Sequence, residues 1–279
     1  MDKDLAKRRL KKGLQYFVAI LLAVITFFPL IITLLNSLKS NNDILLGMFN
    51  LPTIWRFSNY PEAIVTANAV GSITRSLLIA VATLVLVIVV AMPGAYAIAR
   101  KRYKYLKAIY ILFMAGVMVP VHCTLVSINR MANVVNGKNN YLFLVLVYAA
   151  FNLSQAIFLF TSYIRSIDRG MDEAAKIDGC SDLQLLVRIL LPICGPIIAT
   201  EAILVFIYGY SELIFSLILI NKNTMYTVSR AILNFTSNYT TSYGPEFAFI
   251  ILAMIPMLII YLFLHEKVAD GMMAGAIKG

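Results

Sequence analysis

The sequence predicts an all-α, polytopic membrane protein with six transmembrane helices. Apolar residues make up 60% of the 279 residues and charged residues only 14%, whereas charged residues are about a quarter of ordinary soluble domains. Six apolar segments approach the roughly 20 residues that a helix needs to cross a bilayer. None of them alternates as the strand of a membrane barrel does. Lipid must therefore be the solvent for much of the folded surface.

The six expected spans contain no charged residue, except that the fifth carries Glu201 and Glu212. They cover residues 14–38, 76–99, 108–129, 139–164, 192–221 and 247–264. Each proline in the interior of a span removes a helix hydrogen bond and favours a kink, and these prolines are Pro29, Pro93, Pro120, Pro196 and Pro256. Residues 1–13 form a basic N-terminal segment, and residues 14–279 are expected to form one transmembrane domain. The first apolar segment is too long for a signal peptide and lacks a cleavage pattern, so we interpret it as an uncleaved span.

Basic residues are concentrated on one set of loops. Most of the 24 lysine and arginine residues lie before the first span, between the second and third spans, between the fourth and fifth spans, or after the sixth. The positive-inside rule places these loops, together with both termini, in the cytoplasm. The net charge of +10 follows from this topology and from anionic lipid headgroups, so it requires no nucleic acid as a partner.

Residues 165–192 form a polar loop between the fourth and fifth spans. Its pattern predicts two short helices. Asp172 suits the positive end of the first helix dipole, and Gly179 is a natural helix stop. Ser181 and Gln184 form a capping box that begins the second helix. The same pattern is also compatible with an amphipathic helix that lies on the membrane surface, so these residues alone do not decide between the two.

The stretch from Glu173 to Pro192 resembles the EAA loop of permease subunits in bacterial ABC importers. That loop reads E-A-A, then D-G-A, then I-x-L-P, and here only Cys180 differs, in place of the last alanine of D-G-A. In that family a cytoplasmic coupling helix in this loop docks the membrane subunit onto a separate ATPase. The resemblance therefore implies an ATPase-coupling role for Glu173, Ala174, Ala175, Asp178, Gly179 and Pro192.

Other segments extend this resemblance over nearly the whole chain. Asn36–Lys39 is similar to the N-S-x-K pattern of the family, and Ala95–Arg100 to its A-Y-A-x-A-R pattern. The ending Gly275–Gly279, with the sequence G-A-I-K-G, resembles the tail of the maltose-type carbohydrate subgroup. It implies a sugar or oligosaccharide as the transported substrate. In the family this tail reaches the ATPase, which implies a contact role for Lys278 and Gly279.

No nucleotide-binding or hydrolytic motif is present, since G-x-x-x-x-G-K-[ST], H-E-x-x-H and G-x-S-x-G do not occur. We therefore expect no catalytic residue, no metal site and no bound cofactor in this chain. The resemblance implies that ATP and Mg²⁺ are bound by partner subunits. The implied assembly contains a second, homologous permease, two ATPase subunits and an extracytoplasmic solute-binding protein. The resemblance also implies a multi-pass protein of the bacterial plasma or inner membrane.

Polar residues within the spans are candidates for the substrate path. An acidic group deep in a membrane helix costs about 2.5–3.5 kcal/mol, so it usually faces the bundle interior or water. Asn152, Gln155 and Glu212 have side chains that could contact sugar hydroxyls or could bridge helices instead. An ion- or proton-coupled carrier that uses Glu201 and Glu212 is the alternative function, although the internal repeat typical of many carriers is not visible. A structural or sensory membrane protein is a third interpretation, and it leaves the EAA pattern unexplained.

Overall fold

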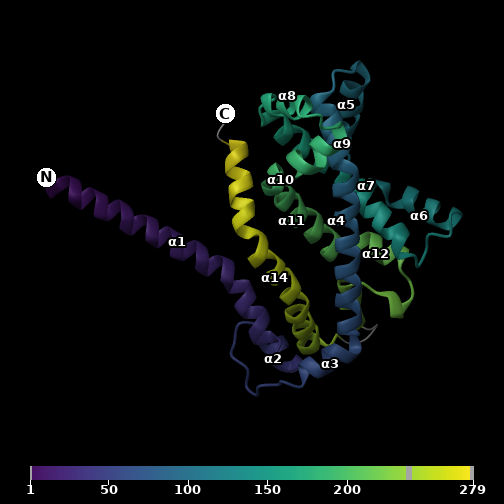
Figure 1. The fold of residues 1–279 in the computed structure, drawn as a ribbon. Coiled ribbons are helices and arrows are strands. Elements are labelled where there is room, and N and C mark those ends of the chain that lie inside the picture. Colours follow the sequence, from purple (N-terminus) through teal and green to yellow (C-terminus); the bar gives the residue numbers. More distant parts are fainter. Residues whose placement is uncertain (1, 237–240, 277–279) are drawn as a thin grey trace. The chain divides into compact units, whose positions relative to one another are not determined.

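The computed structural model describes residues 2–236 and 241–276, with side chains for residues 11–236 and 241–263. Figure 1 shows that these residues are mostly helical. The described part of the chain contains no strand, and its single β-bridge joins Thr236 to Thr241. The predicted all-α fold class is confirmed.

Four helices are long and apolar enough to cross a membrane, and two further pairs of helices pass the same test as bent spans. The four helices are α1 (Asp2–Asn36), α4 (Ala69–Arg100), α7 (Tyr141–Ser166) and α14 (Tyr243–Ala276). If each bent pair is one span, the described residues form six spans, in agreement with the sequence.

The first bent pair joins α5 (Lys104–Met118) to the segment Val121–Val134 at an angle of 96°. This segment consists of a 3₁₀ turn (Val121–Thr124) and α6 (Leu125–Val134). The break falls at Pro120, because proline lacks the N–H that would continue the helix and disfavours a helical conformation in the residue before it. Val119 is accordingly extended, with a ψ angle of 122°. The span predicted over residues 108–129 is thus sharply bent near its middle.

The second bent pair joins the segment Asp182–Ile193 to α11 (Gly195–Ser211) at an angle of 77°. The first member is built from α9 (Asp182–Gln184), a π-helical segment (Leu185–Leu190) and α10 (Leu191–Ile193). Beyond α11 the backbone is extended at Glu212, and α12 (Ile214–Leu219) follows. The span predicted over residues 192–221 is therefore divided among α10, α11 and α12.

The chain divides into two compact units. The first comprises Met1–Ala69 and Ile232–Met254, and the second comprises Val70–Ala231 and Ile255–Gly279. The short helical elements of the first unit are α2 (Asn41–Leu46), α3 (Asn59–Thr66) and a 3₁₀ turn (Leu233–Phe235). Those of the second unit are α8 (Gly170–Ile177), a 3₁₀ turn (Asn223–Met225) and α13 (Val228–Ile232), whose last residue already belongs to the first unit.

In the second unit, α5 and α11 pack against α7. Val87 of α4, Phe160 of α7 and Val205 of α11 are fully buried in one apolar cluster. The chain is also closely packed at Gly209 of α11, where an added Cβ would lie 3.1 Å from the Cα of Ala80 in α4. Small residues at both positions let the two helix backbones approach closely. Such packing matters in a membrane, because the hydrophobic effect contributes little to the association of helices in lipid and van der Waals contacts have to hold them together.

The first unit contains a buried polar cluster around the end of α1. The ammonium group of Lys39 is fully buried and donates hydrogen bonds to the carbonyl oxygens of Gly47 (3.1 Å) and Met48 (3.0 Å). The amide of Asn59 donates to the carbonyl oxygens of Ser37 and Lys39, both at 2.9 Å. Burial lowers the pKa of Lys39, because removal from water disfavours its charged form. These bonds tie three segments together where no regular helix satisfies the backbone.

We expect Lys39→Met to destabilise the protein by about 1–3 kcal/mol, because the carbonyl groups of Gly47 and Met48 lose a charged donor while the apolar stem is retained. The measurement is the midpoint of thermal unfolding in detergent. Lys12→Met, at an exposed lysine of α1, is the matched control and should leave the midpoint unchanged. Equal midpoints for Lys39→Met and the unmodified protein would show that the bonds contribute no net stability.

Candidate functional site

The predicted EAA loop has the local shape that the sequence indicates. Helix α8 is followed by Gly179 in the left-handed region, with a φ angle of 82°, where a side chain would be strained. The capping box is present: the Ser181 hydroxyl accepts from the Gln184 N–H at 3.3 Å, and the Gln184 side chain accepts from the Ser181 N–H at 2.8 Å. The prediction of two short helices joined by a glycine turn is therefore confirmed.

The residues predicted to couple to an ATPase differ in their exposure. Ala175 is buried and packs in the apolar cluster with Leu185 and Leu190. The others lie at the surface: Glu173, Ala174, Asp178, Gly179 and Pro192. The exposed side chains Ile177 (86%) and Leu183 (70%) add apolar area beside them. The loop thus has one face attached to the protein and one face open to a partner.

The end of α4 holds α8 through a buried ion pair. The guanidinium Nε of Arg100 lies 2.7 Å from a carboxylate oxygen of Asp172, and the two side chains are only 5% and 13% exposed. A second guanidinium nitrogen donates to the carbonyl oxygen of Ile167 at 3.1 Å. The sequence predicts Asp172 only as a favourable charge at a helix start, so this longer-range role is a finding of the tertiary structure.

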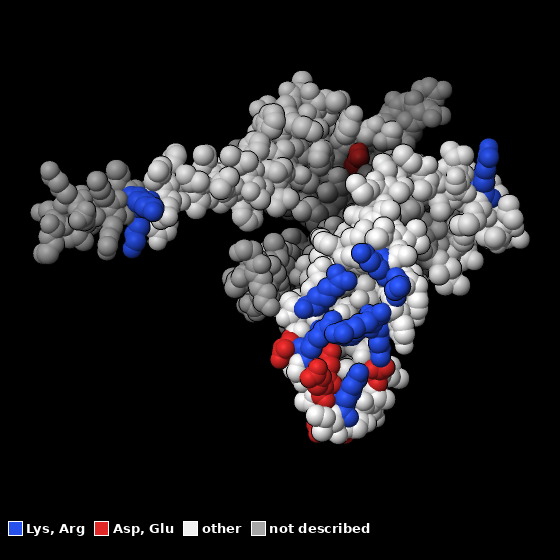
Figure 2. Space-filling model, turned by 90° about the horizontal axis from the view of Figure 1, so that it is seen from above, with Lys and Arg blue, Asp and Glu red and all other residues white. Residues whose placement is uncertain are grey.

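The end of α4 also holds α9. The Tyr96 hydroxyl donates to one carboxylate oxygen of Asp182 at 3.0 Å, and the Lys101 ammonium lies 2.5 Å from the other. We call Tyr96, Arg100 and Lys101, together with Asp172 and Asp182, the α4 brace. Figure 2 shows basic and acidic side chains gathered in this region. Tyr96 and Arg100 belong to the A-Y-A-x-A-R segment. This resemblance is the one feature of the sequence that points to these two residues, and it does not reveal their partners.

The carboxylate of Glu212 is occupied by donors from the protein. The Tyr148 hydroxyl donates to it at 2.8 Å, the Phe215 N–H at 3.0 and 3.1 Å, and the Ser216 N–H at 3.2 Å. These N–H groups belong to the first turn of α12, which no intrahelical acceptor can satisfy. Glu212 therefore caps α12 after the break that ends α11. Its predicted role in the substrate path stays a prediction, and these contacts account for the residue without it.

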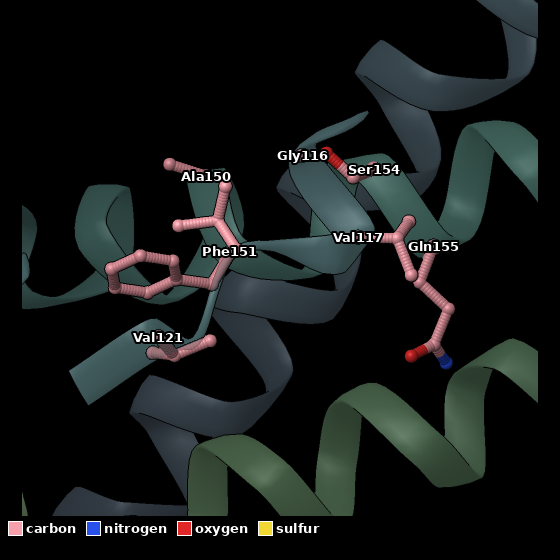
Figure 3. Close-up of a pocket in the computed structure, with 8 residues that line it drawn as sticks. Gly116, Val117, Val121, Ala150, Phe151, Ser154 and Gln155 are labelled. Atoms are coloured by element: carbon pink, nitrogen blue, oxygen red, sulfur yellow. The ribbon is translucent and has the colours of Figure 1, made fainter. Parts of the chain in front are cut away.

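Asn152 and Gln155 lie on α7 but have different surroundings. Asn152 is buried, and its amide donates to the carbonyl oxygen of Tyr148 one turn earlier, at 2.8 Å. Gln155 lines a cavity of about 320 Å³ together with Ser154 and residues of the bent α5 pair such as Gly116. Figure 3 shows the Gln155 amide extending from this cavity toward a neighbouring helix. Of the two residues, Gln155 is the less buried.

Glu201 of α11 is fully buried, and neither of its carboxylate oxygens has a hydrogen-bond partner of normal geometry within the described residues. The Gln155 side chain lies close enough to influence it electrostatically. A buried carboxyl group without a donor is costly. Glu201 thus lacks the set of donors that surrounds the Glu212 carboxylate.

The remaining predicted positions and groups lie elsewhere. Lys278 and Gly279 are outside the described residues. Among the residues that the structure describes, no group of three or more His, Cys, Asp or Glu side chains could hold a metal ion.

Comparisons with known sequences identify relatives along nearly the whole chain. Residues 88–273 match the family described as binding-protein-dependent transport system inner membrane component. A protein of Caldicellulosiruptor sp. (strain Rt8B.4), designated as ABC transporter permease protein ORF2, is 32% identical over 273 residues, which are 96% of this chain and 98% of that protein. The diacetylchitobiose uptake system permease protein NgcG of Streptomyces coelicolor is 28% identical over 268 residues, with 95% and 89% coverage.

A solved structure has the same fold. It is a crystal structure of a bacterial ABC transporter involved in the import of the acidic polysaccharide alginate. One of its chains superposes with a TM-score of 0.77 at 22% identity, and the match covers 92% of this chain and 96% of that chain. The family match covers more than half of the sequence, and the identity to a full-length relative exceeds 30%. The chain therefore belongs to the family of binding-protein-dependent transport system inner membrane components, the membrane-spanning permease subunits of ABC importers.

Proposed function

We propose that this permease subunit forms part of an ATP-driven importer of a sugar or oligosaccharide. Two observations support a carbohydrate as the transported substrate. One relative is named as a permease of a diacetylchitobiose uptake system, and the G-A-I-K-G ending of this sequence resembles the tail of the carbohydrate subgroup. Members of this family are transport subunits and not enzymes. Family membership also favours ATP-driven import over an ion-coupled carrier that uses Glu201 and Glu212.

The proposed assembly contains a second, homologous permease, two ATPase subunits that bind ATP and Mg²⁺, and an extracytoplasmic solute-binding protein. Both termini and the EAA loop are proposed to be cytoplasmic, in the plasma or inner membrane of a bacterium. The support for this orientation is the concentration of basic residues at the α4 end, the start of α5 and the EAA loop, because positive charge is retained on the cytoplasmic side.

The exposed face of the EAA loop is the proposed contact with an ATPase. The observation that supports this most is the α4 brace behind that face. A partner that pushes on Glu173 or Ala174 displaces α8, and the ion pair of Asp172 with Arg100 transmits the displacement to α4. Asp182 provides a second connection, from α9 to Tyr96 and Lys101. Because α4 is a membrane span, motion of the loop would become motion of the transmembrane helices.

Substitutions on the exposed face of the loop should stop uptake without preventing membrane insertion. Glu173→Lys reverses a charge at the proposed contact, and Gly179→Asp forces a side chain into a left-handed turn. We expect uptake to be lost and the ATPase to dissociate during purification. Glu62→Lys, at an exposed glutamate of α3, is the control and should transport normally. Normal uptake by well-expressed Glu173→Lys and Gly179→Asp proteins would refute the coupling role.

Loss of the buried ion pair should uncouple transport from ATP hydrolysis. Arg100→Ala leaves Asp172 buried without its partner, a change that costs about 3–5 kcal/mol at buried pairs. In the reconstituted complex we expect less substrate transported per ATP hydrolysed, while the ATPase remains bound.

The double variant Arg100→Asp/Asp172→Arg restores the opposite charges and should regain part of the transport yield. Tyr96→Phe, which removes only the hydroxyl bond to Asp182, should have a smaller effect. An unchanged transport yield in Arg100→Ala would contradict transmission through the brace.

Gln155 and Glu212 should respond differently to substitution. Gln155→Ala should raise the KM for uptake, because it removes an amide that lines the cavity. Glu212→Ala should lower stability by about 1–2 kcal/mol through loss of the α12 cap, and Tyr148→Phe should share part of that loss. Uptake kinetics and thermal unfolding in detergent separate the two. The assignment is wrong if Glu212→Ala raises the KM without loss of stability.

A further inference from the structure

The second unit has a cavity at the end of α4 that the transport function leaves unused. Its volume is about 580 Å³, and it lies between the end of α4, the first turns of α5 and the end of α7. Half of its lining residues are basic, and none is acidic. The basic residues are Lys101, Arg102, Lys104, Lys107 and Arg165.

Most of this positive charge has no acidic partner. The two salt bridges found among the described residues belong to Arg100 and Lys101, so Arg102, Lys104 and Lys107 form none there. Lys104 and Lys107 are exposed and three residues apart on α5, which places like charges side by side on one helix face. Repulsion between them is relieved when an anion lies between them.

The start of α5 adds to the positive potential of the cavity. Tyr103 precedes the helix and provides no side-chain cap, and the first turn contains no acidic residue. The first N–H groups of a helix lack intrahelical acceptors and carry the positive end of its dipole. Arg165, from the end of α7, lies over the ring of Tyr110 at 5.0 Å, which holds a further cation at the wall.

The position and the apolar lining of the cavity favour a lipid over a soluble anion. The apolar helix α4, which is long enough to cross a membrane, ends at Arg100, and the end of a span is where lipid headgroups are expected. Ile98, Leu106 and Ile111 form part of its wall, and exposed Leu112 continues the apolar surface along α5. Exposed Tyr103 and its stacked neighbour Tyr105 are side chains typical of the membrane interface.

We propose that this cavity binds the phosphate headgroup of an anionic phospholipid, with its acyl chains along the apolar surface of α5. Lys104, Lys107 and Arg165 supply the charge, as in other basic pockets between membrane helices. Lys101 lines the cavity and also pairs with Asp182 of the α4 brace. The bound lipid therefore lies against the connection between the EAA loop and α4.

The test is native mass spectrometry of the full-length chain, purified in detergent with mixtures of phosphatidylglycerol and phosphatidylcholine. The unmodified protein should retain phosphatidylglycerol in preference to phosphatidylcholine. Lys104→Gln/Lys107→Gln should weaken that retention by roughly thirtyfold, given the attraction of each of the two lysines for an anionic membrane surface. Lys104→Arg/Lys107→Arg keeps the charge and should keep the lipid. Lys11→Gln/Lys12→Gln removes the same charge from exposed positions of α1 and should change nothing.

Three outcomes would overturn the proposal. The first is equal retention of phosphatidylglycerol by Lys104→Gln/Lys107→Gln and the unmodified protein. The second is complete displacement of the lipid by millimolar inorganic phosphate, which would identify a site for free phosphate. The third is unchanged lipid retention together with loss of a co-purifying ATPase from the glutamine variant, which would identify a protein contact. Loss of uptake in an EAA variant with normal lipid retention would leave the two proposals separate.

Discussion

Backbone polar groups inside a bilayer have to be satisfied by the protein itself, and the same need for partners accounts for polar side chains where helices end or bend. Along the straight helices the backbone satisfies itself. Where a helix ends or bends, side chains take over: the Glu212 carboxylate accepts the first N–H groups of α12, and Lys39 and Asn59 supply donors to loop carbonyls after α1. Polar residues at helix breaks are therefore first of all structural, and a role in transport needs separate support.

The same reasoning separates two acidic residues that look alike in the sequence. Glu201 and Glu212 lie eleven positions apart within one predicted span. The Glu212 carboxylate accepts hydrogen bonds from three groups, one hydroxyl and two backbone N–H groups, whereas Glu201 is fully buried without a hydrogen bond of normal geometry. Glu201 lacks such a set of donors, and its polar neighbour is Gln155, which lines a cavity. The polar group with the least satisfaction is the better candidate for a functional role.

The EAA loop combines a rigid attachment with an open surface. Ala175 and Leu185 anchor it in the apolar cluster, while the ion pairs of Asp172 and Asp182 attach both of its helices to one membrane span. An ion pair of low exposure resists separation, because each charge would be left without a partner in poor solvent. This attachment is the basis of the proposed transmission of motion from the loop to α4. The basic cavity next to Lys101 lies where the surrounding lipid has access to this connection.

The sequence by itself determined the features that depend on local physics: six apolar segments, the glycine turn and the capping box at Ser181. Each follows from composition or from residues a few positions apart. The sequence also offered five prolines as places for a kink, and the packing of the helices decided that Pro29, Pro93 and Pro256 lie inside continuous helices. Only the tertiary structure decided the size of the bends, the cap function of Glu212 and the α4 brace, in which Tyr96 and Asp182 are 86 positions apart. Such contacts depend on how distant helices pack, and a polar side chain has the same appearance in a sequence whether it meets a helix end, an ion-pair partner or a substrate.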